Sequence, residues 1–139
     1  MNFNLDKYKT VIFDCDGVVL NSNFIKAKCF YLSVKDLGDK LAKDFINYHK
    51  NQGGLSRVKK YDYLIDNILP KYKILVKDKR LFHKELISKY ELLLQSHILK
   101  ADLSPFLKKL REQNNSLDWI MISGSNQIEL RAVSYTHLR

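Results

Sequence analysis

The chain has 139 residues, 45% of them apolar, which favours a packed domain, or a small domain carrying an insertion, over disorder. It contains no apolar run of about 18 residues and no hydrophobic leader after Met1, so we expect no membrane span, no signal peptide and a cytoplasmic location. The formal charge of +9 arises mainly in residues 23–100, where it fits either a solvated helical surface or a field that attracts anionic ligands.

The first predicted element is a strand at residues 11–13, Val-Ile-Phe. These residues are β-branched or aromatic without a polar interruption, so we expect a strand buried on both faces, as in a parallel sheet. Asp14 and Asp16 follow at its carboxyl end, which faces the ligand crevice in an open α/β sheet. Residues two apart on an extended backbone point the same way, and Gly17 lets the chain turn at once. The sequence therefore predicts paired carboxylates at a strand end.

Residues 23 to about 99 are predicted to form four helices and no strand. Gly38 is expected to end the first helix, while Ser56 caps the third and Pro70 closes it. The expected apolar faces are, in order, Phe24, Ala27, Tyr31, Val34 and Leu37; Leu41, Ala42, Phe45, Ile46 and Tyr48; Val58, Tyr61, Leu64, Ile65 and Ile68; and Leu81, Phe82, Leu86, Ile87, Tyr90, Leu93 and Leu94.

A further helix and a second buried strand are predicted after residue 100. Ser104 and Pro105 are typical of a helix start. The inward residues of this helix are expected to be Phe106, Leu107 and Leu110. Residues 117–122 form the strand candidate, which ends in the polar turn at residues 123–126. Two parallel strands that end in such turns can align their ends beside one ligand, so we predict an α/β fold.

The cysteines are predicted to be free thiols. Cys15 lies between the two carboxylates, where a disulfide would obstruct the site, and Cys29 is the only other cysteine. A reducing compartment fits this prediction.

This set of residues suits phosphoryl chemistry. Two carboxylates can bind a hard divalent cation, or one can act as a nucleophile while its neighbour transfers protons. The Ser123 hydroxyl and the backbone N–H groups of the Gly124 turn can hold phosphate oxygens. A calcium loop is the alternative, but an EF-hand needs further ligands and a closing Glu, and the apolar strand before Asp14 does not fit it.

The chain resembles the haloacid-dehalogenase-like hydrolase superfamily, in its phosphoglycolate phosphatase-like form with a helical cap after the first motif. Residues 11–22, VIFDCDGVVLNS, carry the first motif, and residues 120–125, IMISGS, carry the second. The resemblance implies a Rossmann-like parallel-sheet core from residues 1–22 and 100–133, and a helical cap from residues 23–99. Residues 134–139 look like a translated cloning adapter, so we expect a non-native or disordered tail.

The resemblance also implies the roles of the site residues. Asp14 would be the nucleophile, and its carboxylate would bind Mg²⁺ together with the backbone carbonyl of Asp16. Asp16 would protonate the leaving alkoxide and later activate the water that hydrolyses the aspartyl-phosphate. Ser123, with Gly124, would bind the phosphoryl group. Because a halide leaves without a proton, Asp16 favours a phosphatase or a phosphomutase over a dehalogenase.

The loop at residues 53–60 is a candidate for substrate contact, since similar capped hydrolases place such a loop over the active site. Arg57 is suited to bind a phosphate or carboxylate in a forked geometry, and Lys60, one helical turn later, is expected to share its face. The alternative is a capped helix start whose charges are simply solvated. The expected substrate is a small phosphorylated metabolite.

Two other readings stay open. A sugar-phosphate mutase shares every motif discussed above. A basic helical module that binds polyanions would explain the charge, although no nucleic-acid motif is present. Neither a nucleic acid nor a membrane is the expected partner. The third-motif lysine and fourth-motif acids of the family are not recognisable in the sequence. We therefore expect an N-terminal fragment of a longer hydrolase, with little or no activity of its own.

Overall fold

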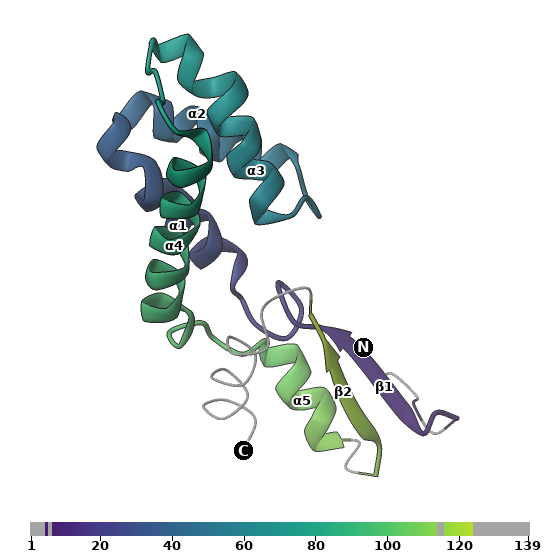
Figure 1. The fold of residues 1–139 in the computed structure, drawn as a ribbon. Coiled ribbons are helices and arrows are strands. Elements are labelled where there is room, and N and C mark those ends of the chain that lie inside the picture. Colours follow the sequence, from purple (N-terminus) through teal and green to yellow (C-terminus); the bar gives the residue numbers. More distant parts are fainter. Residues whose placement is uncertain (1–4, 6, 114–115, 124–139) are drawn as a thin grey trace. The chain divides into compact units, whose positions relative to one another are not determined.

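The computed structural model describes residue 5, residues 7–113 and residues 116–123. The chain divides into two compact units (Figure 1). One, called the strand unit here, consists of Met1–Asn23 and Ile98–Arg139, and the other, called the helical unit, is Phe24–His97. The predicted α/β class is confirmed, because the structure combines parallel strands with helices. None of the described helices is both long and apolar enough to cross a bilayer.

The strand unit holds two parallel strands, β1 (Thr10–Asp14) and β2 (Asp118–Ile122), together with helix α5 (Pro105–Gln113). The register pairs Thr10 with Asp118 and Asp14 with Ile122, so both strands end at the same level. The Cys15 N–H donates to the Ile122 carbonyl at 3.0 Å and extends the pairing one residue past β1. The carboxyl ends of the two strands are thereby held side by side.

The prediction that both strands are buried on both faces is wrong. Exposure alternates along each strand, and Ile12, Ile120 and Ile122 are 58%, 47% and 57% exposed. The opposite face is half-buried and includes Phe13 and Trp119, whose rings stack 5.2 Å apart. A strand is buried on both faces only where further strands or helices cover both, and the sheet of the described residues has two strands.

The helical unit is built from helices without a strand, as predicted, and all of its residues are described. Its elements are α1 (Asn23–Val34), η1 (Lys35–Leu37), α2 (Asp39–Asn51), α3 (Arg57–Tyr63), η2 (Leu64–Ile68), η3 (Leu69–Tyr72) and α4 (Lys79–Ile98). The predicted cap at Ser56 is confirmed, since its hydroxyl accepts the Lys59 N–H at 3.4 Å. The predicted start of α5 at Pro105 is also confirmed.

Four buried rings form the centre of the helical unit and are called the aromatic core here: Phe30, Phe45, Tyr61 and Tyr90. Phe30 contacts the other three, with ring centroids 4.3 Å apart for Tyr90 and 5.8 Å for Phe45. The Tyr61 hydroxyl lies 2.6 Å from the Ser33 hydroxyl, and burial raises the pKa of Tyr61 above its ordinary value. These rings come from α1, α2, α3 and α4, so they tie the helices together.

Several residues predicted to face inward are exposed instead. Phe24 is 76% exposed, whereas α1 buries Cys29, Phe30, Ser33 and Val34. Apolar residues surround α1 on all sides, so the spacing rule cannot select the buried face. Val58, Leu81 and Phe106 are also about half exposed, because each lies in the first turns of its helix, at the margin of the packed region.

Pro70 does not close the third helix, contrary to the prediction. The helical path runs from α3 through the π-helical turn η2 into the 3₁₀ turn η3, which contains Pro70 near its start. A proline at the beginning of a helical turn is tolerated, because its missing N–H has no partner there in any case. The path ends at Lys73, which takes a left-handed φ of 57°.

Neither cysteine forms a disulfide, as predicted, and both are buried. Burial raises the pKa of Cys29 to about 11, so its thiol stays protonated near neutral pH.

Candidate active site

The two predicted carboxylates lie at the carboxyl end of β1. Asp14 is the last residue of the strand and is exposed, Cys15 is 2% exposed, and Asp16 is half-buried. This alternation is what an extended segment produces, so the two carboxylates share the more open side while Cys15 points inward. A compact turn follows, in which the Cys15 carbonyl accepts the N–H groups of Val19 and Leu20 at 3.1 and 2.9 Å.

The turn requires a glycine at position 17. Gly17 has a φ of 78°, a left-handed conformation that other residues adopt only with strain, and its N–H donates to the Leu20 carbonyl at 2.7 Å. A Cβ atom at this position would also collide with the side-chain amide of Asn23. The glycine thus permits the tight turn that sets Asp16 beside the strand end.

The Asp16 carboxylate links three parts of the strand unit. The Ser22 hydroxyl donates to one carboxylate oxygen at 2.7 Å, and the Ser123 hydroxyl, directly after β2, donates to the other at 3.5 Å. Ser22 is fully buried, so its hydroxyl is fixed in place. The structure therefore brings Asp16 and Ser123 together, while Gly124, the other predicted phosphate-binding residue, lies outside the described residues.

Ser22 is a site residue that the sequence interpretation did not assign. It belongs to the first motif, but its contact with Asp16 spans a turn whose path cannot be read from residue spacing. Ser22 lies between Asn21 and Asn23, so residue type does not indicate that its hydroxyl is buried and needs a partner.

Ser22→Ala is expected to slow about tenfold any reaction in which Asp16 transfers a proton, because the Asp16 carboxylate loses the donor that orients it. Ser22→Thr keeps the hydroxyl and is the matched control. The rate of that reaction measures the effect, and equal rates in the alanine and threonine variants would contradict the positioning role.

The donor set at the strand end fits Mg²⁺. Among the described residues there is no group of three or more His, Cys, Asp or Glu side chains placed to hold a metal ion. Mg²⁺, however, commonly binds through one or two carboxylates and completes its shell with water and substrate phosphate. The exposed Asp14 carboxylate and the Asp16 backbone carbonyl are hard oxygen ligands of the kind it prefers.

Arg57 and Lys60 belong to the helical unit, at the start of α3. The Arg57 guanidinium lies 3.2 Å from the Glu91 carboxylate and 5.4 Å from the Tyr90 ring. Lys60 is only 6% exposed, and its ammonium donates to His49 Nδ1 at 2.9 Å. Lys60 also lies 5.6 Å from the centroid of the Phe30 ring, so it faces the aromatic core as Arg57 does, but it is buried there.

The Lys60 and His49 pair predicts a loss of stability in acid. The pKa of His49 is lowered from 6.5 to about 4, first by burial and then by the positive charges of Lys60 and Lys50. The unfolded chain therefore takes up a proton at a pH where the folded unit does not. The contribution of His49 to the free energy of unfolding is fully present above about pH 6.5. It is lost as the pH falls toward 4, and the loss is about 1–2 kcal/mol for this half-buried ring.

Urea unfolding followed by far-UV circular dichroism at about pH 7 and pH 4.5 measures this loss. His49→Gln keeps an acceptor for the Lys60 ammonium but cannot titrate, so its unfolding midpoint is expected to change less between the two pH values. An identical pH dependence in the two proteins would assign the acid sensitivity to other groups.

A family model described as haloacid dehalogenase-like hydrolase matches residues 8–137. A comparison with curated proteins gave no match.

Proposed function

The chain belongs to the haloacid dehalogenase-like hydrolases, and we propose that it is the phosphatase type, a Mg²⁺-dependent phosphomonoester hydrolase that works through an aspartyl-phosphate. One observation carries the proposal: Asp16, two residues after the exposed Asp14, accepts hydrogen bonds from Ser123, directly after β2, and from the buried Ser22. A nucleophile and a proton carrier require this kind of adjacency.

In the proposed reaction, a carboxylate oxygen of Asp14 attacks phosphorus and the bond to the ester oxygen breaks. Protonated Asp16 gives its proton to the departing alkoxide, which leaves as an alcohol. Asp16 then takes a proton from water as that water attacks phosphorus, and inorganic phosphate and the Asp14 carboxylate are released. Ser123 donates a hydrogen bond to a phosphoryl oxygen, and bound Mg²⁺ would offset the repulsion between carboxylate and phosphate.

The two units take separate roles in this proposal. The strand unit would act as the Rossmann-like core predicted for residues 1–22 and 100–133, and the helical unit would act as the cap predicted for residues 23–99. Arg57 exchanges Glu91 for an anionic group of a small phosphorylated metabolite, and buried Lys60 supports it with positive charge. A cytoplasmic location accords with the free cysteines.

The proposal is tested first by a readout that needs no turnover. Trifluoroberyllate binds a carboxylate oxygen in the place of a phosphoryl group, so it is expected to give a protein-bound ¹⁹F resonance that depends on Mg²⁺. Phosphate release from sugar phosphates and phosphoglycolate is measured in parallel, with ³¹P spectra to detect an isomerised sugar phosphate.

The proposal would be contradicted if the chain, with Mg²⁺ present, gave no bound ¹⁹F resonance and released no phosphate. An isomerised sugar phosphate as the main product would replace hydrolase by mutase.

A further inference from the structure

Residues 71–80, called the basic loop here, carry the densest positive charge of the helical unit. The segment reads KYKILVKDKR, with five basic residues and one acidic residue, and it joins η3 to α4. Its basic residues Lys71, Lys73, Lys77, Lys79 and Arg80 are all exposed. Asp78 is the one acidic residue within this segment.

An apolar side chain projects from the middle of this charge. Leu75 is 94% exposed, the highest value among the large apolar residues of the described chain, and it lies between Lys73 and Lys77. Its neighbours Ile74 and Val76 are half-buried. A leucine held in water between two lysines favours a partner that accepts both apolar and cationic groups.

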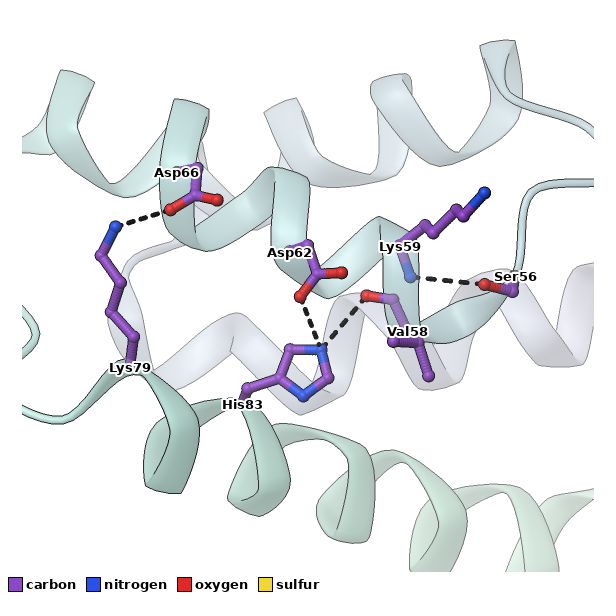
Figure 2. Close-up of polar contacts among 7 residues, drawn as sticks. All are labelled: Ser56, Val58, Lys59, Asp62, Asp66, Lys79 and His83. Atoms are coloured by element: carbon purple, nitrogen blue, oxygen red, sulfur yellow. Dashed lines mark hydrogen bonds and ion pairs between the residues drawn. The ribbon is translucent and has the colours of Figure 1, made fainter.

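The helical unit holds both ends of the basic loop. Figure 2 shows the Lys79 ammonium on the Asp66 carboxylate at 2.6 Å, and His83 within 3.2 Å of both the Asp62 carboxylate and the Val58 carbonyl. At the other end, the Lys73 N–H donates to the Pro70 carbonyl at 3.0 Å. Contacts with the helical unit thus hold the basic loop at both of its ends. The Asp66 carboxylate neutralises part of the Lys79 charge.

We propose that the basic loop docks the helical unit onto an anionic lipid surface. The lysines pair with headgroup phosphates and Leu75 enters the apolar boundary below them, an arrangement that adds apolar burial to electrostatic attraction. A single-stranded nucleic acid is a weaker fit, because the one aromatic residue of the loop, Tyr72, donates its hydroxyl to Asp44 at 2.6 Å and is not presented for stacking. From the sequence we expect no membrane as a partner; the exposure of Leu75 among the lysines is the observation that favours one here.

The test uses the 139-residue chain and cosedimentation with phosphatidylserine and phosphatidylcholine vesicles, compared with phosphatidylcholine alone. Lys73→Asn with Lys77→Asn is expected to weaken partitioning about 25-fold, at about fivefold per lysine. Asparagine tolerates the left-handed backbone at position 73, so thermal unfolding should be little changed. Leu75→Ser is expected to weaken partitioning about tenfold. The matched control, Lys40→Asn with Lys50→Asn, removes the same charge from exposed positions of α2 and should change partitioning less than about threefold.

Three outcomes would overturn the proposal. One is the absence of binding to the anionic vesicles. Another is an equal loss in the control pair, which would indicate a diffuse charge effect. The third is salt-dependent binding to RNA or DNA, without vesicle binding, that Leu75→Ser leaves unchanged.

Discussion

Asp14→Asn is expected to abolish the protein-bound trifluoroberyllate resonance and to lower any phosphorylation of the chain at least about a thousandfold. The amide is nearly isosteric with the carboxylate, but it supplies neither the anionic nucleophile nor a charged ligand for Mg²⁺. Asp14 is exposed at the end of β1, so the loss of its charge is expected to change the stability of the fold little. Unchanged thermal unfolding in the variant would show that the loss is chemical.

Asp16→Asn is expected to distinguish the role of Asp16 in proton transfer from the role of Asp14 as the nucleophile. A phosphomonoester with a leaving group that needs no proton, such as p-nitrophenyl phosphate, is still expected to phosphorylate Asp14 in this variant, whereas an alkyl phosphate is not. The phosphorylated form should then accumulate, because the base that activates water is missing. Loss of activity that is equal for both kinds of ester would contradict the assignment of proton transfer to Asp16.

Phe45→Ala is expected to cost about 3–5 kcal/mol, a large part of the stability that is typical for a unit of this size. Phe45 is fully buried, and its ring contacts Phe30 and Tyr61. The alanine would leave a cavity among three helices that cannot close without moving the aromatic core. Urea unfolding by far-UV circular dichroism measures the cost.

Tyr61→Phe is the matched control for this prediction. It keeps the ring in the aromatic core and removes only the hydroxyl, which lies 2.6 Å from that of Ser33. Ser33 retains its hydrogen bond to the Phe30 carbonyl at 2.8 Å, so the expected cost is about 1 kcal/mol. If Tyr61→Phe cost as much as Phe45→Ala, the hydrogen bond rather than ring packing would dominate the core.

The features that were predicted correctly depend on short-range signals. Ser56 and the pair at Ser104 and Pro105 mark helix starts through groups that lie within one turn, and both were confirmed. The approach of Ser123 to Asp16 joins distant parts of the sequence, but parallel strands bring their carboxyl ends to one edge. Alignment of strand ends is therefore the one long-range relation that local pattern predicted here.

The features that were missed depend on which partner a side chain finds in three dimensions. The burial of Lys60 depends on an acceptor, His49, on another helix. The burial of Phe30 instead of Phe24 depends on rings from three other helices. The helical path continues through Pro70 because its hydrogen bonding changes to π-helical and then to 3₁₀. Residue type alone does not predict this change.

The stack of Phe13 and Trp119 makes the two units separable by spectroscopy. Trp119 is the only tryptophan of the chain and lies on β2, while its partner ring comes from β1. Tryptophan emission therefore reports on the strand unit, whereas the far-ultraviolet signal comes mainly from the helices of the other unit. Two denaturation curves from one sample can thus tell whether the units lose their structure together or one after the other.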